Sequence, residues 1–162
     1  MSKPNAFIGI DPGAKGAICV VVPTENIQHF LTTVHPPDKI YESLLNISGD
    51  YNLSPIMIEN VSSIPGAAAG SNFKFGFNVG LLQGIIKSTA IGMDTVRPKA
   101  WQKEIGVGTK FKGNAIKKEV ARLANQLYPK AELYGPRGGL LDGRSDALMI
   151  AHHCLLKYTN EK

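Results

Sequence analysis

The chain has 162 residues and a formal net charge of +5, and 43% of its residues are hydrophobic. This length suits one domain with its own core, so we expect a single domain over residues 1–162. No apolar run approaches the roughly 20 residues of a membrane-spanning helix, and residues 1–5 lack an apolar signal region, which argues against a membrane partner and favours the cytoplasm. The two cysteines, Cys19 and Cys154, are expected to be buried free thiols.

Apolar periodicity predicts three leading strands and then alternating strands and helices. The predicted strands cover residues 6–11, 17–22, 26–34, 56–59 and 93–96. The predicted helices cover residues 38–47, 75–90, 115–127 and 144–157, with a short helix that begins at Pro98. A helical crossover between the first and fourth strands makes them parallel neighbours. The pattern therefore predicts an α/β fold, a mixed five-stranded sheet with helices on both faces.

The segment over residues 62–71 is rich in Gly, Ala and Ser, and we expect a loop there. The helix after it carries Gly76, Gly80 and Gly84 at four-residue intervals, so one side of the helix admits a close backbone neighbour. We expect this side to pack on the sheet, and a contact between two copies of the chain is the alternative.

Carboxylates stand at three places where apolar runs end or begin. Asp11 and Glu59 end two strands that we expect to be parallel neighbours, so their side chains should lie near each other. Asp142 and Asp146 begin the last helix four residues apart, on one side of it. Each acid also has an ordinary explanation: Asp11 ends a strand in a turn, Asp142 caps a helix, and Asp146 pairs with a basic residue. Together they indicate a metal site, because grouped carboxylates repel one another and Mg²⁺ prefers oxygen ligands.

Basic residues gather between positions 97 and 122, where eight Lys and Arg accompany two Glu. Such a cluster gains affinity for nucleic acid by releasing counterions, whereas a solvated helix face is the alternative. The candidate phosphate contacts are Lys103, Lys110, Lys112, Lys117 and Lys118. Acids for metal ions beside bases for phosphates form the charge layout of a nuclease.

With these residues in view, the chain resembles the RuvC family of Holliday junction resolvases, in the ribonuclease H-like superfamily, and is most similar to its phage members. The matching segments are Ile8-Gly9-Ile10-Asp11-Pro12-Gly13, Ile58-Glu59, Lys74-Phe75-Gly76, Val96-Arg97-Pro98 with the basic segment after it, and Ser145-Asp146-Ala147-Leu148. The family commonly spaces its last two ligands three residues apart, and here Gly143 stands at that position. Asp142, four residues before Asp146, is the substitute because both spacings share a helix face.

The resemblance implies a ribonuclease H-like nuclease domain in which Asp11, Glu59, Asp142 and Asp146 hold two Mg²⁺ or Mn²⁺ ions. It also implies that a homodimer cuts branched DNA, in the host cytoplasm if the protein is phage-encoded. The family stacks an aromatic residue on the junction. Phe73, with Lys74 beside it, is the candidate here because it precedes the predicted helix and should be exposed, whereas Phe75 and Phe77 are core candidates.

Three other functions remain open from the sequence. A ribonuclease H-like nuclease could act on RNA or RNA–DNA hybrids, and a non-catalytic protein could bind branched DNA. The third alternative is a nucleotide-binding module, because the Asp-Pro-Gly-Ala-Lys-Gly segment after the first strand also resembles the phosphate loop of actin-like sugar kinases. Those kinases have two lobes, and 162 residues supply one.

Overall fold

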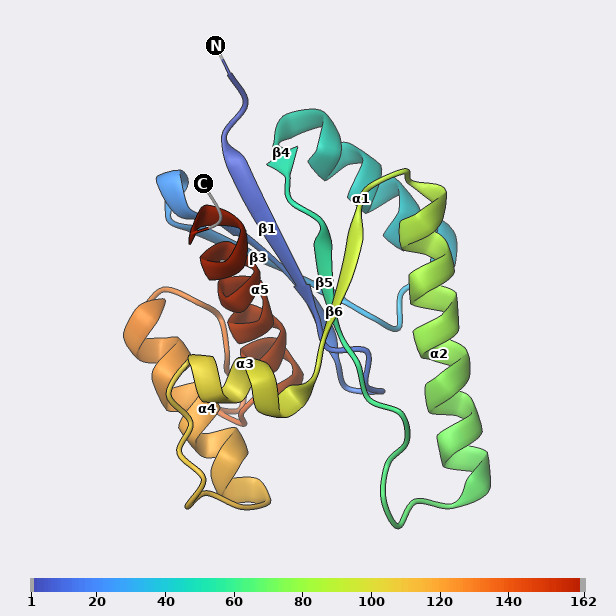
Figure 1. The fold of residues 1–162 in the computed structure, drawn as a ribbon, viewed down its shortest axis with the longest axis vertical. Coiled ribbons are helices and arrows are strands. Elements are labelled where there is room, and N and C mark those ends of the chain that lie inside the picture. Colours follow the sequence, from blue (N-terminus) through green and yellow to red (C-terminus); the bar gives the residue numbers. More distant parts are fainter. Residues whose placement is uncertain (1, 161–162) are drawn as a thin grey trace.

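The computed structural model describes residues 2–160 and contains one mixed sheet between two layers of helices (Figure 1). The strands are β1 (Asn5–Ile10), β2 (Ala17–Val22), β3 (Ile27–Thr32), β4 (Asn52–Leu53), β5 (Ile56–Glu59) and β6 (Met93–Val96). Their order is β3-β2-β1-β5-β6, and β4 pairs with the start of β1. The three leading strands are antiparallel, whereas β1, β5 and β6 are parallel. This confirms the predicted fold class, and the two-residue β4 is a sixth strand that the sequence did not predict.

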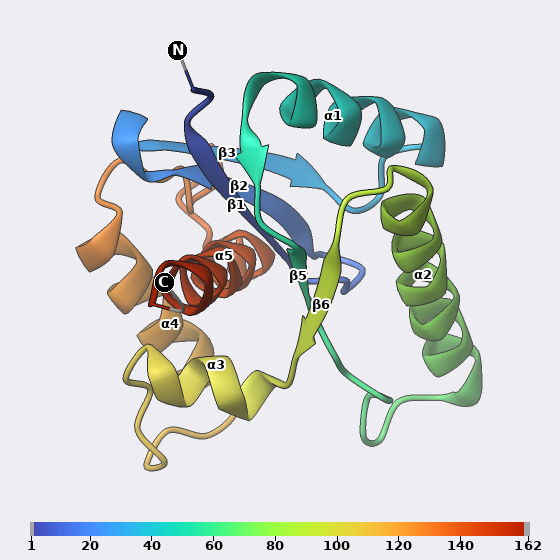
Figure 2. The same ribbon diagram turned by 45° about the horizontal axis from the view of Figure 1, so that its top comes forward.

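The helices divide between the two faces of the sheet (Figure 2). They are α1 (Pro37–Asp50), α2 (Ala69–Ser88), α3 (Pro98–Glu104), α4 (Asn114–Leu127) and α5 (Asp142–Asn160), with a single 3-10 turn, η1 (Pro23–Glu25). α3, α4 and α5 cover one face, and α1 and α2 cover the other. Within residues 2–160, no helix combines the length and apolar character needed to cross a membrane.

Alternating residues of the central strands feed two separate cores. Phe7 of β1 belongs to the core under α5, and its neighbour Ile8 belongs to the core under α1 and α2. This period of two explains why the strands read as continuous apolar runs, since both faces of the sheet are covered. Cys19 and Cys154 are buried as free thiols in the α5 core.

Helix α2 begins at Ala69, six residues before the predicted start. The Asn72 side chain accepts a hydrogen bond from the Ile64 backbone N–H at 2.7 Å, which ties the preceding loop to the first turn of the helix. Glycine, serine and asparagine have weak helix propensity, so this segment did not read as helical from the sequence. The loop prediction therefore holds only for the residues before 69.

The predicted packing of the α2 glycines on the sheet is wrong. A Cβ atom placed at Gly76, Gly80 or Gly84 would meet nothing within 4 Å, because this side of the helix faces outward. Phe77 lies on the outward part of the helix too, with 62% of its surface exposed, so it is not a core residue. Leu82, Ile85 and Ile86 hold α2 to the rest of the protein instead.

Helix α5 lies against the sheet at Gly9, a residue of the first matching segment whose close contact with the helix the sequence did not predict. A Cβ atom at Gly9 of β1 would lie 2.2 Å from the Ala151 backbone nitrogen and 2.4 Å from the Ala147 carbonyl oxygen. Only a residue without a side chain allows the helix and the strand to approach so closely. This contact sets the position of α5, and with it the position of the acids at the start of the helix.

Candidate active site

The first two acids lie side by side at the carboxyl ends of β1 and β5. The parallel register pairs Ile10 with Ile58, so Asp11 and Glu59 are the next residues of the two strands. Asp11 accepts a hydrogen bond on Oδ1 from the Gly13 backbone N–H at 3.0 Å, which holds its side chain in the turn after β1. The expected neighbourhood of Asp11 and Glu59 thus follows from strand order and register.

Glu59 has a partner that the sequence did not suggest. The indole Nε1–H of Trp101 donates a hydrogen bond to Glu59 Oε1 at 2.9 Å. Trp101 is fully buried in α3, so its ring is fixed by packing and its N–H has one direction in which to point. A lone tryptophan just after a strand end, among basic residues, was the only signal for this contact.

The other two acids come from the first turns of α5, and the structure explains their four-residue spacing. Residue 143 is buried against the β1–β2 turn, where a Cβ atom would lie 2.0 Å from the Lys15 carbonyl oxygen. Only glycine fits at that position, so the acid stands one residue earlier, at Asp142. Asp142 is partly exposed at the helix start, and Asp146 is mostly buried one turn further on.

The four carboxylates interact with one another electrostatically. Burial raises the pKa of Asp146 to about 8, and the charges of Asp11, Glu59 and Asp142 add to that rise. Burial likewise raises the pKa of Glu59 to about 7, where the Trp101 hydrogen bond lowers it and the Asp11 charge raises it. The pKa of Asp11 is also raised, chiefly by burial, against the lowering effect of the Gly13 N–H. Without a cation, ionising all of these carboxyl groups at neutral pH would therefore cost free energy.

Lys117 of α4 is a cation that interacts with three of the four acids, and its role as a phosphate contact stays a prediction. Its ammonium donates a hydrogen bond to Asp142 Oδ2 and also interacts with the charges of Asp146 and Asp11. Partial burial raises the pKa of Asp142. Lys117 and the backbone N–H groups of residues 142 and 143 lower it by more, so the net pKa lies below the ordinary value. A positive charge is thus favoured at this edge of the sheet.

The fit of a divalent cation rests on donor chemistry. All four side chains offer carboxylate oxygens, the ligands that Mg²⁺ prefers, and their mutual repulsion is what such an ion relieves. Within residues 2–160, no three His, Cys, Asp or Glu side chains converge closely enough to hold one ion. Glu59 is turned to Trp101 and Asp142 to Lys117 in this arrangement.

The remaining predicted lysines lie on α3, α4 and the loop between them. Lys103 and Lys112 line a cavity of about 490 Å³ together with Lys99, and its floor includes Phe111 and other apolar groups. The Lys110 ammonium lies 5.2 Å from the centre of the Phe111 ring, and Lys118 is exposed on α4. All five predicted lysines are exposed, Lys117 included, as a surface for phosphates requires.

The predicted aromatic contact lies on a different element than expected. Phe73 is 74% exposed, but it belongs to the first turns of α2 rather than to a preceding loop. Lys74 is exposed beside it, and Phe75 is half-buried. The exposed position of Phe73 is confirmed, although the reason given for it was wrong.

No protein-family model and no curated protein matches the sequence. Among solved structures, Thermus thermophilus RuvC in complex with a Holliday junction substrate is similar, with a TM-score of 0.59 and 14% identity. That match covers 95% of this chain and 96% of the other. A second Thermus thermophilus RuvC structure matches over the same shares, with a TM-score of 0.57 and 14% identity. The chain therefore has a RuvC-like, ribonuclease H-like fold.

Proposed function

We propose that this chain is a metal-dependent, structure-selective endodeoxyribonuclease that resolves Holliday junctions and other branched DNA. The observation that carries the proposal is the electrostatic coupling of Asp146 to Asp11, Glu59 and Asp142 at the carboxyl ends of β1 and β5. The RuvC-like fold supports it, because ligands of open α/β sheets bind at this edge.

The four acids would hold two Mg²⁺ or Mn²⁺ ions, with Asp11, Glu59 and Asp146 as the main ligands and Asp142 beside them. Bound there, the ions would lower the pKa of the attacking water and stabilise the departing 3′ oxygen. The protein groups orient this chemistry: the Gly13 N–H positions Asp11, and the Trp101 indole positions Glu59. Lys117 adds a positive charge at the same edge, where it favours the approach of a phosphate.

The substrate surface would extend from the acids across α3 and α4. Lys103, Lys110, Lys112 and Lys118 would contact phosphates, and Phe73 with Lys74 would meet the junction from α2. Figure 1 supports this arrangement, because α3, α4 and the first turns of α2 all lie at the end of the sheet where β5 and β6 stop.

A homodimer would supply the two symmetric cuts that a four-way junction needs. The outward side of α2 supports a contact between copies, since Phe77 is 62% exposed beside the open row of Gly76, Gly80 and Gly84. Bulky rings from one helix could pack against the glycines of the other. In sedimentation, wild-type protein should be a dimer and Phe77→Ser should be a monomer, and a monomeric wild type would contradict the dimer.

The nuclease proposal is tested with a labelled synthetic four-way junction, with Mg²⁺ or with EDTA. Cleavage should require the metal, and Asp146→Asn should abolish it while junction binding persists, because the variant keeps the size of the side chain and adds no charge at the DNA-facing edge. Asp38→Asn, on exposed α1, is the matched control and should cleave normally. Cleavage by Asp146→Asn at the wild-type rate would overturn the ligand assignment.

The same assay separates the alternatives. Faster cleavage of an RNA–DNA hybrid than of the junction would favour a ribonuclease, and junction binding without cleavage in Mg²⁺ or Mn²⁺ would favour a non-catalytic binder. Saturable ATP binding would favour the nucleotide-binding module.

A further inference from the structure

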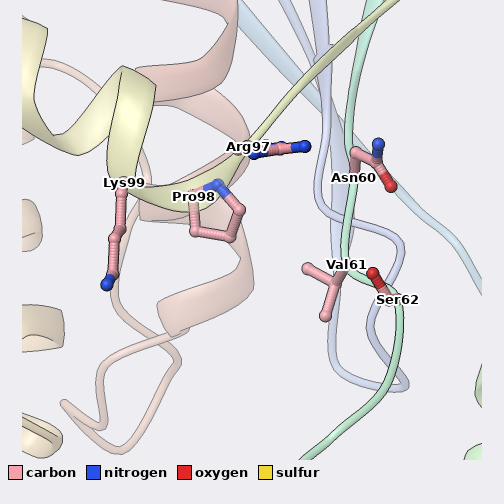
Figure 3. A pocket seen from close by; sticks show the side chains of 6 residues that line it. All are labelled: Asn60, Val61, Ser62, Arg97, Pro98 and Lys99. Atoms are coloured by element: carbon pink, nitrogen blue, oxygen red, sulfur yellow. The ribbon is translucent and has the colours of Figure 1, made fainter.

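A cavity of about 390 Å³ lies immediately beyond the acids, at the ends of β5 and β6 (Figure 3). Glu59 pairs with Val96 in the parallel register, and the Asn60 backbone N–H donates a hydrogen bond to the Val96 carbonyl oxygen at 2.8 Å. Asn60 and Arg97 therefore leave the sheet next to each other, one residue past Glu59. The cavity between them opens at the same edge of the sheet as the carboxylates.

The lining of this cavity combines two cations, Arg97 and Lys99, with neutral polar groups and small apolar walls. Figure 3 shows the Arg97 side chain extending across the cavity toward Asn60. Val61 and Pro98 stand on opposite sides below them, and the Ser62 hydroxyl lies at the Val61 side. Among residues 2–160, those that line the cavity carry no carboxylate, so its chemistry differs from that of the neighbouring acidic site.

Arg97, unlike Arg122 and Arg144, has no acidic partner among residues 2–160. Arg122 pairs with Glu119, and Arg144 lies 3.8 Å from Glu132. The Arg97 guanidinium is exposed and free to accept an anion, and its planar set of donors matches the oxygens of a phosphate. Arg97 follows directly after Val96, the residue that pairs with Glu59 in the sheet.

The size and lining select one kind of ligand. A volume of about 390 Å³ lies in the range of pockets that bind small molecules, and it is open to an attached chain. A phosphate matches Arg97, an uncharged sugar or base edge matches the Asn60 amide and the Ser62 hydroxyl, and flat apolar atoms match Val61 and Pro98. A nucleotide carries all three of these kinds of group, so it is the ligand that matches the lining.

We infer that this cavity holds one nucleotide of the DNA strand next to the phosphate that is cut, with Arg97 binding the phosphate of that nucleotide. The inference rests on the proposed nuclease function and adds a strand-positioning subsite to it. Arg97 is a positioning residue here: it fixes the strand beside the acids and takes no part in the bond cleavage itself.

The test compares Arg97→Ala, Arg97→Lys and, as matched control, Lys39→Ala on α1, where Lys39 is exposed and pairs with Glu42. Binding to a labelled four-way junction is measured in EDTA over a range of salt concentrations, and cleavage is measured in Mg²⁺. Arg97→Ala should reduce the salt slope of log K by about 1, the value for one lost phosphate contact. Arg97→Lys should retain the slope, and Lys39→Ala should match wild type.

A local measurement accompanies the binding curves. A short single-stranded oligonucleotide, added in EDTA, should shift the NMR signals of the Asn60 side-chain amide and the Arg97 Nε–H. A junction that wild type cuts, with an unchanged slope in Arg97→Ala and unshifted signals, would overturn the subsite and leave the nuclease intact. Shifted signals and a reduced slope without cleavage would support the subsite and overturn the nuclease.

Discussion

The two longest helices are α2 and α5, and the glycines associated with them differ in environment. Those at α5 pack against backbone, whereas those on α2 are exposed. α5 has eight buried residues and touches backbone directly at Gly9 and through Gly143, where an added Cβ would lie 2.0 to 2.2 Å from main-chain atoms. α2 has three buried residues, and Gly76, Gly80 and Gly84 face open space. The α5 contacts position the candidate site, whereas the α2 row leaves a surface available to another molecule.

The comparison shows that glycine spacing within a helix does not indicate what the helix packs against. The regular four-residue row is on the open helix, and the tight contact uses single glycines on separate elements. The following experiments test this contrast, beginning with the largest expected effect.

Gly9→Val should prevent stable folding at 25 °C, because its side chain would collide with the Ala147 and Ala151 backbone and force α5 away from the sheet. The matched change Gly80→Ala, on the open row of α2, should raise the unfolding free energy by up to about 1 kcal/mol through better helix propensity. Urea unfolding followed by circular dichroism measures both. Equal effects of the two variants would refute the contrast between the helices.

The raised pKa values of two carboxyls should make the free energy of unfolding of the metal-free protein fall as the pH rises. The folded protein holds protons on Asp146 up to a pKa of about 8 and on Glu59 up to about 7, well above the values of 3.8 and 4.5 expected when unfolded. Between pH 5 and 8 the folded state therefore binds more protons, and the unfolding free energy should decrease by up to about 6 kcal/mol.

Chemical unfolding in EDTA at several pH values measures that decrease. Asp146→Asn should remove most of it, and Asp38→Asn should retain it. If the unfolding free energy of the wild type did not change with pH, the two carboxyls would be well solvated and their pKa values would not be raised.

Trp101→Phe should lower the unfolding free energy by about 1 to 2 kcal/mol, because it removes the hydrogen bond to Glu59 and leaves a small gap in the α5 core. A double-mutant cycle with Glu59→Ala isolates the contribution of the pair. A coupling energy of zero would contradict the contact.

Phe77→Ser should change the unfolding free energy of the monomer by less than about 0.5 kcal/mol, since the ring is mostly exposed on α2. Leu82→Ser on the same helix is the matched buried change and should cost several times more. Dilute-solution unfolding curves of both variants give the comparison. A large cost for Phe77→Ser would mean that the outward side of α2 is already covered within one chain.

The sheet and the adjacent ends of β1 and β5 were predicted well, because both follow from local patterns. Asp11 and Glu59 each follow an apolar run, and parallel pairing then brings strand ends together. That Asp142 takes the place of residue 143 as a ligand stays a prediction drawn from helix geometry. The reason that residue 143 is a glycine is its buried position against Lys15. That position depends on how the helix meets a distant turn, and it cannot be inferred from the spacing of residues.

Contacts between distant residues were the main omission. Trp101 and Glu59 are 42 residues apart, and Lys117 and Asp142 are 25 apart, so neither pair follows from periodicity. The outward direction of the α2 glycines was missed for a related reason. A helix pattern defines faces relative to one another, but the face that meets the sheet is settled by packing over the whole chain.

The hydrogen bond between Trp101 and Glu59 gives the protein an optical reporter of its own. Trp101 is the only tryptophan in the chain, so all indole emission comes from a ring in direct contact with a candidate ligand. Titrating unlabelled protein with acid, divalent ions or DNA should therefore change its intrinsic fluorescence, without a dye or a tag.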